Sequence, residues 1–354
     1  MTCDCMCIKV RTGGSVLRVY YARTQTMSSS KNKYTGDWIK SPWADCWLLG
    51  PEWVLEKTSV EITHSPDSDD ELESWTVGGS TYELFDQDDE NEFNLCKNVC
   101  EPFHAQMNGT GCWNIGESMI CKIMKWSEGM LTEAEIIGFV HKNIKEVPLP
   151  RIFAYWTDTT LGLSFMLMER AIGKPLSEVW HKYNDEEKSA IIDDLGNIYS
   201  ALAKVESPYF ESIDHKGVFG AVPALDAPEL TKDDKPRYPR HDCASYDRAI
   251  EKKWGSNPCP TLAMCLQHGD LHPGNIIAPD PSTNPGRPIR ITAIIDWEAA
   301  HYAPFWTFPL LLYNLDSFLI EDVKGKAHFR DRMVAELIRR HYEKIYLSRF
   351  RSRR

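Results

Sequence analysis

The sequence predicts an α+β fold of two lobes, a sheet-rich lobe followed by a larger helical lobe. Short apolar runs typical of strands lie between residues 111 and 168. Apolar patterns with helical periodicity dominate after residue 184, and one strand links the two parts. Sheet-forming material followed by helices is the order of an α+β enzyme, whose ligand site commonly lies in a cleft between its lobes.

The first lobe is predicted to contain a β-hairpin and a buried connecting strand. The apolar run 119–124 encloses a single lysine, Lys122, and follows a stretch that includes Gly109 and Gly111. Glycines before an apolar run are typical of a turn between two strands. Residues 161–168 form a second apolar run and predict the buried strand that leads to the next lobe.

Capping boxes predict where two helices begin. Thr132 and Glu135 have the required spacing, and so do Asn184 and Glu187. Each is followed by apolar residues at helical spacing, namely Ile136, Ile137, Val140 and Ile144 in the first helix and Ile191, Ile192, Leu195, Ile198, Tyr199 and Leu202 in the second. A third amphipathic helix is expected at 327–346.

The rest of the second lobe reads as loops and short elements. Residues 208–241 are rich in proline and charge, which predicts loop with short helices. Strand, loop and strand then follow within 266–297, so the polar residues of that loop are held between two apolar segments.

These elements divide the chain into three parts. Residues 1–95 are expected to be an N-terminal extension, 96–168 the nucleotide-binding lobe and 169–354 the helical lobe. Within the extension, 43–62 has enough apolar residues to pack against a core. The segment 67–92 holds eleven carboxylates and no Lys or Arg, which predicts a solvated or disordered stretch.

Charge and hydropathy exclude two classes of protein. The formal net charge of −11 equals the eleven carboxylates of 67–92, so the remainder is balanced and lacks the basic surface of a nucleic-acid-binding protein. The longest apolar run, 305–315, is interrupted by Pro309 and Asn314 and is too short to span a membrane. No secretory signal opens the sequence, so we expect a cytoplasmic protein.

The eleven cysteines are expected to be reduced thiols, because the cytosol keeps thiols reduced. Cys3, Cys5 and Cys7 are spaced more tightly than common zinc ligands and lack a matching second pair. Cys96 and Cys100 are too isolated to complete a metal site.

The strongest chemical signal is His268-Gly-Asp270-Leu-His-Pro-Gly-Asn275, followed 21 residues later by Asp296. Phosphoryl transfer needs a carboxylate that orients the attacking hydroxyl and accepts its proton, which fits Asp270. It also needs oxygen ligands for Mg²⁺, which fits Asn275 and Asp296. Each residue alone fits a polar turn or a strand-end cap better than a catalytic role. The whole set at this spacing favours function.

These motifs, with Ile294-Ile-Asp296-Trp-Glu298, resemble the catalytic and metal-binding motifs of the aminoglycoside phosphotransferase-like family, in particular its large fungal branch. The resemblance covers about residues 100–320 and implies a bilobal protein-kinase-like fold. It also implies an ATP-dependent kinase with Mg²⁺, GTP being a possible donor.

The resemblance assigns nucleotide-binding roles position by position. Lys122 would contact the α- and β-phosphates, and Glu133 would pair with it, because Glu135 fits the capping role better. Backbone groups of Glu169 and Ala171, in a segment similar to the family's hinge, would bond the adenine.

The roles of six further residues are less well defined by the sequence. Gly109 and Gly111, with Gly116, would form the loop over the phosphates, although a full Gly-x-Gly-x-x-Gly pattern is absent. His268 fits a residue that orients the catalytic loop better than a general base. Glu298 would face the same side as Asp296 along a strand, where it would assist the metal, meet a cationic substrate or form a structural ion pair. His301 is a weaker candidate.

Three functions are compatible with these residues. By analogy with the family that the motifs resemble, His-Gly-Asp and Asp-Trp-Glu favour a small-molecule kinase acting on a hydroxyl. A nucleotide-binding pseudokinase that serves as an interaction scaffold is the alternative, with the acidic segment as its contact surface. A protein kinase ranks last, because no Ala-Pro-Glu follows Asp296 and Pro304 comes soon after it. The acceptor pocket is expected within 205–260 and 298–345.

Overall fold

The structure is a computed structural model. It describes thirteen stretches of the chain: 9–12, 15–21, 37–58, 73–86, 95–105, 110–219, 225, 237–255, 261, 263–283, 288–305, 307 and 328–342. Two compact units contain them, residues 1–129 with 151–170 and residues 130–150 with 171–354.

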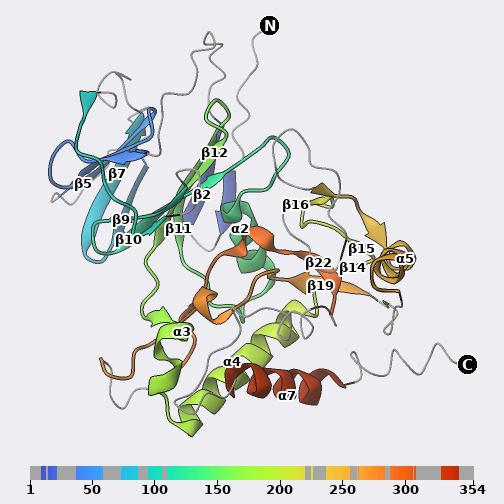
Figure 1. Cartoon of the computed structure of the whole chain (residues 1–354). Coiled ribbons are helices and arrows are strands. Elements are labelled where there is room, and N and C mark those ends of the chain that lie inside the picture. Colours follow the sequence, from blue (N-terminus) through green and yellow to red (C-terminus); the bar gives the residue numbers. More distant parts are fainter. Residues whose placement is uncertain are drawn as a thin grey trace, which may run out of the picture. The chain divides into compact units, whose positions relative to one another are not determined.

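The first unit contains a seven-stranded sheet in the order β1-β2-β11-β12-β10-β9-β8 (Figure 1). Its strands are β1 Lys9–Thr12, β2 Ser15–Tyr21, β8 His104–Ala105, β9 Gly111–Ile115, β10 Met119–Lys125, β11 Ile152–Asp158 and β12 Leu163–Glu169. All neighbouring strands are antiparallel except β2 and β11. The predicted hairpin is β9 with β10, and the predicted buried strand is β12.

The same unit holds a second, five-stranded sheet in the order β3-β4-β5-β7-β6 (Figure 1). Its strands are β3 Ile39–Lys40, β4 Cys46–Leu49, β5 Trp53–Thr58, β6 Glu73–Val77 and β7 Ser80–Asp86. Side chains of both sheets form one buried core. Within it the Trp75 ring stacks on Phe153 at 5.3 Å between centroids, and Trp53 lies 5.6 Å from Trp156. The segment expected to be an extension therefore shares its core with the seven-stranded sheet.

The prediction that 67–92 is solvated or disordered is wrong for 73–86, which form the hairpin β6–β7. Trp75, Val77, Tyr82 and Leu84 are buried, and polar residues alternate with them. Successive side chains of a strand point to opposite faces, so one face packs into the core while the polar residues between these four point away from it. The rest of the acidic segment lies outside the described residues.

The second unit is mainly helical. Its helices are α2 Glu133–Asn143, α3 Leu176–Val179, α4 Asp185–Leu202, α5 Cys243–Trp254 and α7 His328–Tyr342. Both predicted capping boxes are confirmed: the Thr132 hydroxyl accepts from the Glu135 N–H, and the Asn184 side chain accepts from the Glu187 N–H. The predicted apolar faces are buried. The chain thus has the predicted α+β fold.

Helix α2 groups with the second unit, although it was expected in the first lobe. The chain passes into the second unit for the last time between Arg170 and Ala171, close to the predicted boundary at 168/169.

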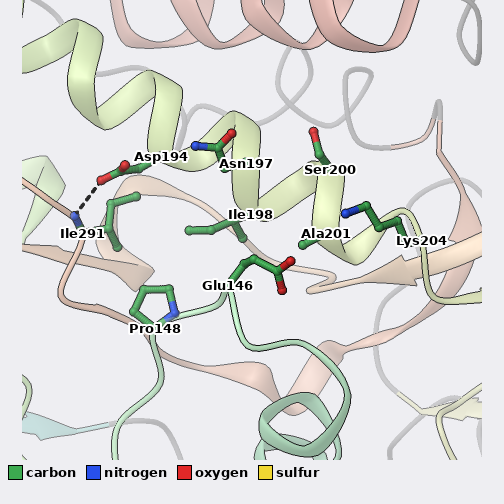
Figure 2. Close-up of a pocket in the computed structure, with 9 residues that line it drawn as sticks. All are labelled: Glu146, Pro148, Asp194, Asn197, Ile198, Ser200, Ala201, Lys204 and Ile291. Atoms are coloured by element: carbon green, nitrogen blue, oxygen red, sulfur yellow. Dashed lines mark hydrogen bonds between the residues drawn. The ribbon is translucent and has the colours of Figure 1, made fainter.

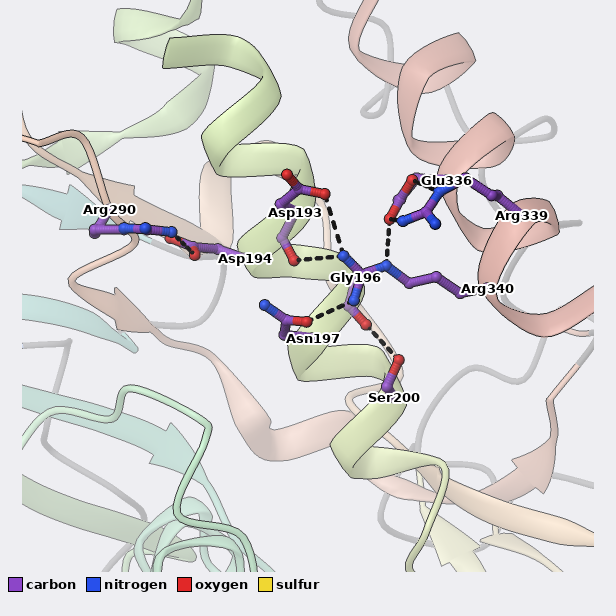
Figure 3. Close-up of polar contacts among 9 residues, drawn as sticks. All are labelled: Asp193, Asp194, Gly196, Asn197, Ser200, Arg290, Glu336, Arg339 and Arg340. Atoms are coloured by element: carbon purple, nitrogen blue, oxygen red, sulfur yellow. Dashed lines mark hydrogen bonds and ion pairs between the residues drawn. The ribbon is translucent and has the colours of Figure 1, made fainter. Parts of the chain in front are cut away.

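Helices α4 and α7 are joined by Arg340 (Figure 3). Its guanidinium donates to the Asn197 side chain at 2.5 Å and to the Asp193 carboxylate at 3.2 Å. The side chain crosses α4 at Gly196, where an added Cβ would lie 2.6 Å from the Arg340 Nε. Glycine at this position permits the close approach, because any larger residue would push the arginine away.

Short sheets complete the second unit. β13 Lys174–Pro175, β20 Ile276–Ala278 and β21 Ala293–Ile294 form one, and β14 Glu206–Ser207, β19 Met264–Gln267 and β22 His301–Pro304 form another. Short strands also pair as β15 Tyr209–Phe210 with β18 His241–Asp242 and β16 Val218–Phe219 with β17 Arg237–Tyr238. The short helices predicted for 208–241 are absent from its described part, which pairs as strands.

Among the described residues, no helix is both long and apolar enough to cross a bilayer. The seven cysteines in this part of the chain are free thiols, while Cys3, Cys5 and Cys7 lie outside it.

Candidate active site

Asp270 lies in a tight loop between β19 and β20 of the second unit. Gly269 precedes it with φ +86°, a conformation that side chains rarely adopt. An added Cβ at Gly269 would lie 2.1 Å from the carbonyl oxygen of Ala299. The loop can therefore approach the segment after Asp296 only because this residue is glycine.

The His268 side chain makes contacts that fix its position next to the catalytic loop. It is buried, and its ring lies 4.4 Å from that of Trp297. Nε2 is 2.9 Å from the Ile295 carbonyl oxygen, and Nδ1 accepts from the Asp270 N–H at 3.3 Å. These partners fit a neutral ring protonated on Nε2. Both nitrogens are occupied, so the geometry fits a residue that positions Asp270 rather than one that moves protons.

Asn275 joins the loop to Asp296. Its Nδ2 donates to the main-chain carbonyl of Asp270 at 2.9 Å and lies 3.4 Å from Oδ2 of Asp296. The Ile295 N–H donates to the carbonyl of Asn275 at 3.0 Å. The amide nitrogen is thus used inside the protein, which leaves Oδ1 as the atom suited to a cation.

Asp296 has left-handed backbone angles, φ 69° and ψ 54°, where the chain passes from β21 into the 3₁₀ helix η4 Trp297–Ala299. Such angles cost energy in a residue other than glycine and are concentrated at functional sites. The next N–H, that of Trp297, donates to Oε1 of Glu133 at 3.0 Å. The first residue of α2 therefore fixes the backbone beside Asp296, a contact that the sequence does not reveal.

The surroundings of Asp270 raise the pKa of its carboxyl group. Partial burial is the main cause and the nearby charge of Asp296 adds to it, while His272 acts in the opposite direction. His272 Nε2 lies 3.8 Å from the Asp270 carboxylate. No role was predicted for His272, because the only signal for it in the sequence was its position two residues after Asp270.

The oxygen atoms at this site fit magnesium. Among the described residues no group of three His, Cys, Asp or Glu side chains is arranged to hold a metal ion. Magnesium is usually bound by one or two protein carboxylates together with water and substrate phosphates. The Asp296 carboxylate and Asn275 Oδ1 meet that requirement.

The structure places Lys122 on β10, buried at 6% exposure and opposite Met166 and Cys112. Lysine is rarely buried unless its ammonium group has a partner. Lys122 belongs to the first unit and Glu133 to the second, and their pairing stays a prediction.

The structure leaves fewer residues for the predicted phosphate loop than the sequence suggests. Gly111 begins β9 with φ +155°, where a Cβ would lie 2.3 Å from the carbonyl oxygen of His104. Gly116 lies at the other end of β9, in the turn to β10. The prediction that it belongs to the phosphate loop is therefore wrong. Gly109 lies outside the described residues.

Four other predicted positions are now located. Glu169 ends β12, and its N–H donates to the Arg151 carbonyl at 2.8 Å, while Ala171 begins the last part of the second unit. Glu298 lies on η4 and is exposed. The expectation that it shares a strand face with Asp296 is wrong, because the chain turns at Asp296. His301 is half-buried, and desolvation lowers its pKa.

The sequence of 118–307, more than half of the chain, matches the phosphotransferase enzyme family. The chain belongs to this family. The matched range of this phosphotransferase contains Lys122, Glu133, His268, Asp270 and the later site residues, whereas Gly109 and Gly111 precede it. No curated protein matches the sequence.

Solved structures resemble this phosphotransferase at low sequence identity. An aminoglycoside-3'-phosphotransferase of type VIII is 17% identical over 71% of this chain and 92% of its own, with a TM-score of 0.41. A streptomycin–ATP–APH(2")-IIa ternary complex is 14% identical over 76% and 87%, with a TM-score of 0.43. ADP-bound APH(2'')-Ib is 13% identical over 74% and 84%, with a TM-score of 0.42.

A separate hollow of about 530 Å³ lies in the second unit of the phosphotransferase (Figure 2). Its lining includes Glu146, Asn197 and Lys204, but none of the predicted site residues. Asp194 at its edge is already bound to the Ile291 N–H and to Arg290 (Figures 2 and 3).

Proposed function

We propose that this phosphotransferase transfers the γ-phosphate of ATP to a hydroxyl group of a small molecule. One observation carries the proposal: the Asn275 amide nitrogen joins the main chain of Asp270 to the carboxylate of Asp296. A base and two oxygen ligands for a cation are thereby held in one bonded unit, which is the arrangement that phosphoryl transfer requires.

Asp270 is the proposed base. Its carboxylate orients the acceptor hydroxyl and takes the proton as the oxygen forms a bond to the γ-phosphorus. The bond from that phosphorus to the β–γ bridging oxygen breaks, and ADP leaves with the electron pair. Burial and the charge of Asp296 raise the pKa of this carboxyl group, which strengthens it as a base.

Asn275 and Asp296 are the proposed ligands of magnesium, which when bound neutralises charge on the phosphates. Lys122 is proposed to contact the α- and β-phosphates, and Glu133 is proposed to hold Lys122 in place by an ion pair. The backbones of Glu169 and Ala171 are proposed to form hydrogen bonds with the adenine ring. Gly109 and Gly111 are proposed to cover the phosphates. His268 keeps the loop in position.

The test compares nucleotide binding with turnover. Thermal unfolding is followed with and without Mg²⁺, using ATP and then GTP, and ADP release is measured with a panel of hydroxyl compounds. Bound nucleotide raises the melting temperature, because only the folded chain binds it. Asp270→Ala is expected to bind without turnover, and Asp296→Ala to lose the magnesium-dependent part of the shift.

Glu146→Gln is the matched control, since it changes an exposed carboxylate of the same unit outside the site. Binding by the unaltered chain without turnover for any acceptor would favour the nucleotide-binding scaffold. No shift with either nucleotide would overturn both proposals.

A further inference from the structure

Arg170, the last residue of the first unit, makes three hydrogen bonds at the end of β12. Its N–H donates to the Ser118 carbonyl at 2.9 Å, and its Nε donates to the Glu117 carbonyl at 3.0 Å. Its Nη2 donates to Oδ1 of Asn114. One side chain thus binds both β9 and the turn between β9 and β10.

The contacts of Arg170 extend to a further segment. Its guanidinium lies 5.6 Å from the ring centre of Phe103, whose N–H donates to the Cys112 carbonyl at 3.0 Å. Phe103 directly precedes β8. A guanidinium can stack on a ring and bind carbonyls in one plane, which lysine cannot do. Arg170 therefore connects β12 to β8, β9 and the start of β10.

These contacts lie at one end of the sheet. Asn114 is next to the turn end of β9, whereas Gly111 and the predicted phosphate loop lie at its other end. Five residues of a strand separate the two ends by about 13 Å. Arg170 thus stabilises the end of the sheet that contains Glu169, the predicted hinge residue, and not the end at which Gly111 lies.

The main-chain bond fixes the direction of one carbonyl. In a planar trans peptide the C=O and the following N–H point in opposite directions. The Arg170 N–H points to the Ser118 carbonyl, so the Glu169 C=O points away from it. The Glu169 N–H is occupied by the Arg151 carbonyl. The carbonyl of Glu169 is thereby held in a defined orientation.

We propose that Arg170 is a positioning residue, which fixes the hinge backbone for recognition of the nucleotide base. This inference rests on the proposed function and adds a residue to the base end of the same site. Loss of the Arg170 side chain is therefore expected to weaken the binding of ligands that carry a nucleotide base. The binding of ligands that carry only phosphates is expected to stay unchanged.

The test compares ATP with inorganic tripolyphosphate, both with Mg²⁺, by calorimetry. Arg170→Met keeps the aliphatic stem and removes both side-chain bonds. It is expected to raise the Kd for ATP about tenfold and leave that for tripolyphosphate nearly unchanged. Arg151→Met is the control, because Arg151 is exposed and lies over Phe153 in the same unit.

Equal weakening of both ligands would show general damage to the sheet and overturn the inference, as would unaltered ATP binding. If the unaltered chain binds no ATP, the proposed function fails and this inference falls with it. Asn114→Ala completes a double-mutant cycle. It is expected to weaken ATP binding in the unaltered chain and to add little after Arg170→Met, because the two side chains share one bond.

Discussion

Replacing Gly269 with alanine tests the close approach that shapes the catalytic loop. The new Cβ would lie 2.1 Å from the Ala299 carbonyl oxygen, an atom that also lies 2.7 Å from Nδ1 of His301. Left-handed backbone costs about 1–2 kcal/mol in alanine, and forced displacement of a packed backbone about 1–3 kcal/mol. We therefore expect Gly269→Ala to lower the free energy of unfolding by about 2–5 kcal/mol.

Gly255→Ala separates the two contributions. Gly255 belongs to the same unit and has φ +75°, but among the described residues no atom lies within 4 Å of its added Cβ. Only the backbone cost remains, about 1–2 kcal/mol. Urea unfolding followed by tryptophan fluorescence gives both values. If the two variants differ by less than about 0.5 kcal/mol, the close approach of Gly269 to Ala299 does not constrain the loop.

Three further predictions concern the site and the core. Asp270→Asn is expected to lower turnover about 10²–10⁴-fold, the usual contribution of a general base, as ADP release will show. Because the pKa of Asp270 is raised on folding, the folded chain binds more protons than the unfolded chain between the ordinary and the raised pKa. Ionisation of Asp270 therefore lowers stability as pH rises through that window, and Asp270→Asn should abolish this part of the pH dependence; an unchanged unfolding profile would contradict it. Glu133→Ala leaves the Trp297 N–H without its acceptor and is expected to cost about 1–3 kcal/mol of stability, whereas Glu133→Gln keeps an acceptor and should cost less; equal losses in urea unfolding would contradict this. Deleting residues 1–95 removes the five-stranded sheet from a shared core, so the shortened chain is expected to be insoluble or to lack a cooperative melting transition, and a soluble, cooperatively melting product would refute the shared core.

Local signals predicted the parts of the fold that neighbouring residues determine. Capping depends on residues three apart, so Thr132 with Glu135 and Asn184 with Glu187 could be read directly. The hairpin β6–β7 was missed because its dense carboxylates concealed the alternation of Trp75, Val77, Tyr82 and Leu84.

The site was predictable where its residues share one loop. His268, Asp270 and Asn275 lie within eight residues, and Asp296 ends the next apolar run. The bond from Trp297 to Glu133 joins residues 164 apart, and no periodicity reports such a contact. The orientation of Glu298 was wrong for a related reason, since it depended on the turn at Asp296.

The shared aromatic core also determines how the chain must emerge from the ribosome. Trp53 is synthesised about 100 residues before Trp156, its partner in the other sheet. At 5–20 residues per second, the first sheet waits roughly 5–20 seconds for the surface that buries it. Throughout that interval a tryptophan-rich face is exposed on the nascent chain. Slower translation lengthens this exposure, so the yield of folded protein should depend on elongation rate and on chaperones that bind apolar strands.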